Sequence, residues 1–146
     1  KPQEREKECL IDLPVDAGIP TDYITSTPIR LEMYKTIANI RSDADANDVY
    51  DELTDRFGIP PAPVYGLVEI ALMRNTAMKL GIYEIKQKGV AVLVEDVKVE
   101  YLVALNEKMR GRATFKSGAK PCISVRIDNG NPIDTVRETL EILQNA

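Results

Sequence analysis

The stretch GIYEIKQKGVAVLVED, residues 81–96, decides the fold class, because the hydrophobic pattern changes its period there. Upstream of Gly81, apolar residues recur at helical spacing. Downstream of it they alternate with polar residues, which is typical of strands with one buried face. The short segment that contains Gly89 is typical of a turn between two paired strands. Helices followed by strands predict an α+β domain.

Three helices are expected before this switch, over residues 27–41, 42–57 and 61–80. Thr27 followed by Pro28 is typical of an N-cap and a first helical turn. Ser42 or Asp43 can cap the second helix, and Gly58 is suited to the position just beyond its end. The third is apolar on much of its circumference, which predicts a place at the centre of a packed layer.

The predicted sheet is small and mostly antiparallel. CLIDLPV, residues 9–15, reads as an edge strand. RATF and CISVRI, residues 112–115 and 122–127, predict two more strands, and two further helices are expected over residues 99–109 and 131–143. Residues 9–146 are therefore expected to form one domain, with the charged segment 1–8 as a linker remnant.

Composition excludes several classes of function. The 146 residues carry a net charge of -4, which argues against nucleic-acid binding as the main role. The chain has no histidine, so the usual base of Ser-His and Cys-His catalysis is missing. Cys9 and Cys122 are widely separated, which fits a reducing cytoplasm better than a disulfide framework. No apolar run is long enough to cross a membrane.

The motifs of catalysis and cofactor binding are also missing. We find no phosphate-binding GxxxxGK[ST] loop, no GxGxxG, no HExxH and no GxSxG. DNGNP, residues 128–132, is interpreted as a turn before a helix cap, since it lacks the remaining ligands of a calcium loop. No residue is predicted to be catalytic or to bind a cofactor or a metal in this segment.

DELTDRFG, residues 51–58, is the most informative motif. At about 100° per residue, the carboxylates of Asp48, Asp51, Glu52 and Asp55 gather opposite the apolar side of their helix, and we call these four the acidic face. A general acid needs a carboxyl group whose pKa is raised by burial, so an outward-facing cluster is poorly suited to catalysis.

Two interpretations of the acidic face remain from the pattern itself. One is a solvated helix surface with a weak ion pair between Glu52 and Arg56. The other is a docking surface for arginines. Asp55 lies in the last turn, where the helix dipole disfavours a negative charge, and such a locally unfavourable choice suggests a function.

A family resemblance favours docking. LPVDAGIPTDYI, RLEMYKTIA, ELTDRFG and MKLGIYEIK follow one another over residues 10–86 as in the C-terminal domain of the bacterial transcription-repair coupling factors, the Mfd family, which the chain resembles. The resemblance implies a parent that is an ATP-dependent DNA translocase and binds DNA, RNA polymerase and UvrA. ATP and magnesium would belong to the parent's motor domains, and this segment would be noncatalytic and need no cofactor.

The resemblance also implies a role for the motif. In the family the terminal domain docks on a UvrB-like module of the same chain and covers its UvrA-binding surface. Glu52 and Asp55 would contact arginines of that module. Phe57 and Gly58 would be structural. Asp48 and Asp51 join the predicted partner-binding set through the helical pattern alone, and Arg56 joins it as a member of the motif.

Two other functions stay open at this point. A small enzyme that uses carboxylates would need a deep pocket holding at least two acidic groups. An acidic module that imitates DNA would present its carboxylates along a stripe. Direct DNA binding could use only a basic stretch formed by Arg110, Arg112, Lys116, Lys120 and Arg126, which is more simply interpreted as solvated strand edges.

Overall fold

The computed structural model describes residues 9–89, 91–95, 98–118, 121–128 and 130–145, so the predicted linker remnant 1–8 lies outside the described residues. The chain divides into two compact units. Val15–Asn75 form the first, called the helical unit. Lys1–Pro14 and Thr76–Ala146 form the second, called the sheet unit. The α+β class expected from the sequence is confirmed, and each unit is described separately.

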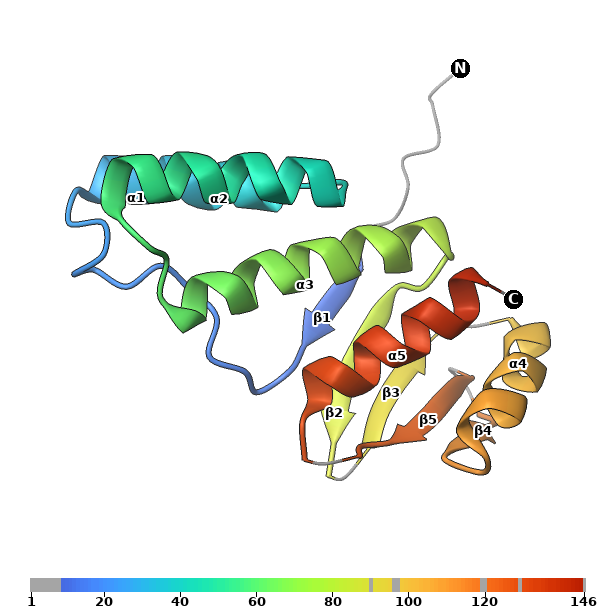
Figure 1. Cartoon of the computed structure of the whole chain (residues 1–146). Helices are drawn as coiled ribbons and strands as arrows, with labels where there is room; N and C mark the ends of the chain where they lie inside the picture. The colour runs from blue at the N-terminus through green and yellow to red at the C-terminus, as the bar shows by residue number, and fades with distance from the viewer. Residues whose placement is uncertain (1–8, 90, 96–97, 119–120, 129, 146) are drawn as a thin grey trace, which may run out of the picture. The chain divides into compact units, whose positions relative to one another are not determined.

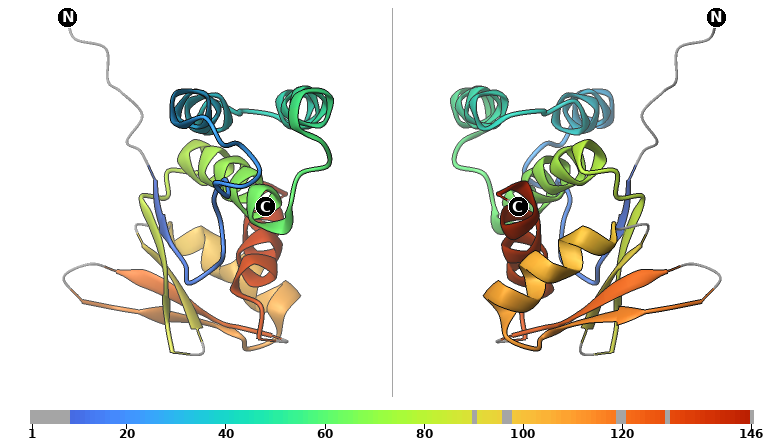
Figure 2. Two further views of the ribbon diagram at one scale, coloured as in Figure 1. Left: turned by 90° about the vertical axis from the view of Figure 1, so that its left-hand side faces the viewer. Right: turned by 90° about the vertical axis from the view of Figure 1, so that its right-hand side faces the viewer.

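The helical unit contains α1 (Thr27–Ala38), α2 (Asp43–Phe57) and most of α3 (Ala62–Lys79). Figure 1 labels the three helices, and Figure 2 shows α1 and α2 side by side. Their apolar faces meet in one core. Its members are buried residues of all three helices and of the segments before and after α1, namely Ile19, Ile24, Met33, Ile37, Ile40, Ala46, Val49, Leu53, Val64, Val68 and Ala71.

The ends of α1 differ from the prediction by a few residues. Ser26, not Thr27, is the N-cap, because its backbone is extended and its hydroxyl accepts a hydrogen bond from the Ile29 N–H. The helix ends at Ala38 rather than near residue 41. Asn39 closes the last turn, and the chain then turns so that Ile40 enters the core.

The predicted start and end of α2 are confirmed. The Ser42 hydroxyl accepts from the Asp45 N–H at 3.1 Å, while the Asp45 carboxylate accepts from the Arg41 N–H at 3.0 Å. The first bond satisfies an N–H group that the first helical turn leaves without a partner, and the second ties the Arg41 N–H, just before the cap, to the same turn. At the other end Gly58 follows Phe57, as the sequence predicts.

The sheet unit holds five strands: β1 (Leu10–Asp12), β2 (Glu84–Lys88), β3 (Ala91–Glu95), β4 (Ala113–Lys116) and β5 (Cys122–Arg126). Their order is β1-β2-β3-β5-β4, and every neighbouring pair is antiparallel except β1 with β2. The predicted edge strand and mostly antiparallel sheet are confirmed. The parallel pair is possible because a long connection separates its two strands.

Helices α4 (Val99–Met109) and α5 (Pro132–Gln144) pack against each other and against this sheet. Alternate residues of the central strands are buried, among them Ile85, Val92, Val94, Ile123 and Val125. The sheet therefore has one apolar face, as the alternation after Gly81 predicts.

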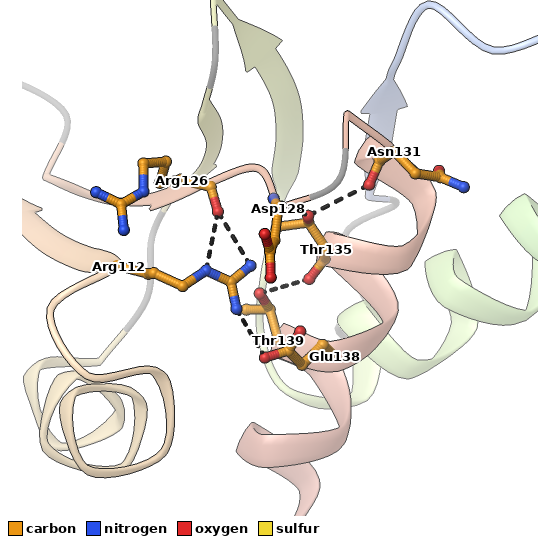
Figure 3. A network of polar contacts seen from close by, with 7 residues as sticks. All are labelled: Arg112, Arg126, Asp128, Asn131, Thr135, Glu138 and Thr139. Carbon is orange, nitrogen blue, oxygen red and sulfur yellow. Dashed lines mark hydrogen bonds and ion pairs between the residues drawn. The ribbon is translucent and has the colours of Figure 1, made fainter.

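A polar network joins α5 to the β4–β5 pair (Figure 3). The Arg112 guanidinium donates to the Arg126 carbonyl from Nε and Nη2, at 3.3 and 3.1 Å, and to the Glu138 carboxylate from Nη1 at 3.0 Å. Beside it, the Thr139 hydroxyl donates to the Thr135 carbonyl at 2.8 Å, so this buried hydroxyl has a partner. Arg112 therefore ties two elements of the sheet unit together.

Candidate functional site

The acidic face lies on the solvent side of α2. Asp48, Asp51, Glu52 and Asp55 are all exposed. On the opposite side Ala46, Val49 and Leu53 are buried, and Tyr50 and Phe57 pack against the same core. The helical pattern therefore predicted the orientation of these carboxylates correctly.

Glu52 is the member of the acidic face that already forms an ion pair, with Arg56. Arg56 Nη1 lies 2.8 Å from Glu52 Oε2, one helical turn away, and both side chains are nearly half exposed. The guanidinium carbon of Arg56 also lies 4.9 Å from the centre of the Phe57 ring. An exposed pair of this kind contributes only about 0.3–0.5 kcal/mol, so a partner can exchange it at little cost.

Asp48, Asp51 and Asp55 differ from Glu52. Within the described part of the chain, none of the three has a hydrogen bond or an ion pair through its carboxylate. The expected pairing of Glu52 with Arg56 is thus present, and it leaves three charges of the face available for a partner.

Gly58 ends α2 in a backbone conformation that other residues rarely adopt. Its φ of 91° and ψ of -176° lie in a region that is essentially restricted to glycine. In this conformation its N–H donates to the Thr54 carbonyl at 3.0 Å. The structural role expected for Gly58 has this physical basis.

Tyr23, from the loop before α1, closes the same end of the helix. Its hydroxyl donates to the Gly58 carbonyl at 2.8 Å and has a longer contact of 3.3 Å with the Leu53 carbonyl. Its ring meets the Phe57 ring edge-on, with centres 5.9 Å apart. Burial raises the pKa of the Tyr23 hydroxyl above its ordinary value of 10.0, with a further contribution from Tyr65. The sequence carried no signal for this contact across 35 residues.

A second aromatic pair is formed by Tyr50 of α2 and Tyr65 of α3. The rings of Tyr50 and Tyr65 are 4.9 Å apart between centres. Burial raises the pKa of Tyr50 to about 12, with smaller contributions from the Glu69 carboxylate and from Tyr65. The Tyr50–Tyr65 contact joins α2 to α3 within the helical unit.

A groove of about 310 Å³ runs between α1 and α2. Asp45, Asp48 and Glu52 line it from α2, and Thr36 of α1 and Asn39, the residue that follows α1, line it on the other side. Asp51 and Asp55 do not line the groove, so the acidic face is divided into two pairs. Sequence reasoning missed the α1 residues, because nothing in a single helical pattern shows which neighbour lies beside it.

The remaining candidates are not assembled into a site. Arg112 is engaged by Glu138 and by the Arg126 carbonyl, which removes it from the basic stretch considered for DNA, and Lys120 lies outside the described residues. Among the residues that the structure describes, no cluster of three or more acidic or cysteine side chains is suited to a metal ion. None of the helices in this described set has the length and apolarity to span a membrane.

Comparisons with known proteins give the family. The model of the TRCF domain matches residues 13–104. The transcription-repair-coupling factor of Mycobacterium tuberculosis (strain CDC 1551 / Oshkosh) is 41% identical over 90 residues, which are 62% of this chain and 7% of the relative. That of Staphylococcus aureus (strain USA300) is 31% identical over 117 residues, which are 80% of this chain and 10% of the relative.

A solved structure has the same fold. The crystal structure of the C-terminal domain of transcription-repair coupling factor matches with a TM-score of 0.82 at 22% identity, over 97% of this chain and 95% of that chain. The chain spans only 7% and 10% of the length of the two relatives named above, so it corresponds to one part of such a protein. The chain belongs to the TRCF domain family, the C-terminal domain of the transcription-repair coupling factors.

Proposed function

We propose that this domain is a noncatalytic, autoinhibitory module of a DNA-repair translocase. In this proposal α2 docks through its acidic face on the UvrB-like module of the same parent chain and covers the surface that binds UvrA. The parent, in the bacterial cytoplasm, would carry the ATP and magnesium sites, the DNA contacts and the contact with RNA polymerase. The domain itself would bind no cofactor.

The observation that supports the proposal best is the exposure of Glu52 and Asp55 on a helix whose end is held in place. Both motif carboxylates face solvent, while Phe57 packs inward and Gly58 and Tyr23 close the helix. A docking residue must be accessible, and a well-held helix end loses little conformational entropy when it binds. These properties suit a partner-binding surface.

The electrostatics also favour a basic partner of moderate affinity. Arginine side chains that meet exposed carboxylates form charge-assisted hydrogen bonds, which weaken as salt screens them. A latch that partner binding must reverse should be worth less than about 5 kcal/mol. A few exposed ion pairs are in that range, whereas a large apolar interface would exceed it.

The test is a titration of the chain with the cognate UvrB-like module at low salt. Glu52→Lys with Asp55→Lys should weaken binding at least about tenfold, because two attractive contacts become repulsive. Glu107→Lys with Glu141→Lys is the matched control, since it changes the net charge equally at exposed positions of α4 and α5. The control should bind within about twofold of the unchanged chain.

Two results would contradict the proposal. Unchanged binding of the Glu52 and Asp55 variant would remove the acidic face from the interface. Equal loss in both double variants would mean that only the net charge of the chain matters.

A further inference from the structure

The groove between α1 and α2 has an apolar floor and polar walls. Ile40 and Val49 supply the floor, and only 3% and 6% of their surfaces are exposed. Its volume of about 310 Å³ is far above the roughly 10–15 Å³ that one water needs. The groove therefore has room for a side chain from another molecule.

The wall residues leave one carboxylate fully available. Asp45 accepts from the Arg41 N–H, and Glu52 is paired with Arg56. Asp48 lies between them along α2, and in the described part of the chain its carboxylate has no hydrogen bond or ion pair. Asp48 lines the groove, and no lysine or arginine is among the described residues that line it.

The opposite wall adds neutral acceptors. The Thr36 hydroxyl donates to the Glu32 carbonyl at 3.1 Å, which leaves its oxygen free to accept. Asn39 carries an amide oxygen on the same wall. The groove thus offers one free carboxylate, two neutral acceptors and an apolar floor.

This combination matches a guanidinium group. Arginine is planar, carries five N–H donors in a fixed arrangement and is weakly hydrated, so its flat face can lie on apolar atoms while its edge donates to several acceptors. A lysine ammonium is compact and strongly hydrated, and it would gain less from the apolar floor. An anion would be repelled by the three carboxylates of the α2 wall.

We infer that the groove is the seat for one arginine side chain of the docking partner, with Asp48 as the principal acceptor and with Thr36 of α1 and Asn39 at its C-terminal end as further acceptors. This inference rests on the proposed function and extends it. Asp51 and Asp55, outside the groove, form a separate open flank for a second cation. The docking surface then includes α1 as well as α2.

The experiment uses the same titration with the UvrB-like module. Asp48→Asn should weaken binding about tenfold, since a charge-assisted hydrogen bond in a partly enclosed site is lost. Asp43→Asn is the matched control, because Asp43 is an exposed aspartate of the same helix that belongs neither to the groove nor to the acidic face, and binding should stay within about twofold. Thermal denaturation of each variant checks that the fold is unchanged.

A second pair of variants tests the groove without removing a carboxylate. Asn39→Arg would place a guanidinium of the chain itself in the seat and should weaken binding about tenfold. Leu31→Arg adds the same charge to α1 at an exposed position that does not line the groove, and it should have little effect.

The outcomes separate the inference from the proposed function. Equal effects of Asp48→Asn and Asp43→Asn, or unchanged binding of Asn39→Arg, would overturn the groove seat. If the Glu52 and Asp55 double variant still loses binding in that case, the docking function stands without the groove. If the double variant binds normally, both fail.

Discussion

The hydroxyl of Tyr23 offers a sharp test of how the docking helix is held. Tyr23→Phe removes the donor to the Gly58 carbonyl, at 2.8 Å, and the longer contact to the Leu53 carbonyl. The ring remains and can keep its edge-on contact with Phe57. The substitution therefore isolates the hydrogen bond from the packing.

The expected effect is local and modest. A hydrogen bond of this kind contributes about 0.5–1.5 kcal/mol. Gly58 is exposed, so water can replace part of the lost interaction, and we expect about 0.5–1 kcal/mol. That free energy corresponds to a roughly two- to fivefold larger population of the frayed helix end.

Amide hydrogen exchange is the suitable measurement. The Gly58 N–H, which donates to the Thr54 carbonyl, should exchange about two- to fivefold faster in Tyr23→Phe. The Asp45 N–H at the other end of α2 is an internal reference and should be unchanged. Tyr101→Phe is the matched control, because no hydrogen bond of the Tyr101 hydroxyl is present in the described structure.

Two results would refute this reasoning. Unchanged exchange at Gly58 would show that the hydroxyl does not hold the helix end. Equal acceleration at Gly58 and Asp45 would show that the substitution loosens the whole helical unit rather than one turn.

Three further predictions concern stability. Gly66→Ala should destabilise the helical unit by about 1–3 kcal/mol in chemical denaturation, although alanine favours helices, because its Cβ would lie 2.8 Å from the Asp16 carbonyl oxygen. Arg112→Lys should destabilise the sheet unit by about 1–2 kcal/mol in thermal denaturation, since lysine cannot reproduce the paired donation to the Arg126 carbonyl. Burial raises the pKa of Tyr50 from 10.0 to about 12, so the contribution of its protonated hydroxyl to stability is complete below pH 10 and is lost as the pH rises through 12. Tyr50→Phe should remove this alkaline dependence of stability, which denaturation measured across that pH range would show.

Each of these three stability predictions has an outcome that would contradict it. A more stable Gly66→Ala would mean that the loop yields without loss. Arg126→Lys is the control for Arg112, because only the backbone carbonyl of Arg126 takes part in the contact, and equal losses in both would refute the assignment. For Tyr50, an alkaline transition that survives in the phenylalanine variant would point to another group.

Much of the fold could be predicted because its determinants are local. Ser42 caps α2 and Gly58 ends it through contacts within four residues, so both positions can be read from the sequence. The start of α1 was misplaced by one residue, because Ser26 and Thr27 can both serve as caps and only the backbone conformation chooses between them. The exposure of the acidic face follows from helical periodicity and was also predictable.

The sequence by itself determined the class of fold, the two ends of α2 and the outward orientation of Asp48, Asp51, Glu52 and Asp55. Only the tertiary structure decided that β1 pairs with β2 in parallel, that Tyr23 closes α2, and that α1 divides the four carboxylates into a groove pair and an open pair. The physical reason is the separation along the sequence over which each kind of interaction acts. Capping and periodicity act between residues within about one helical turn, whereas these contacts join distant segments that only the burial of a shared core brings together.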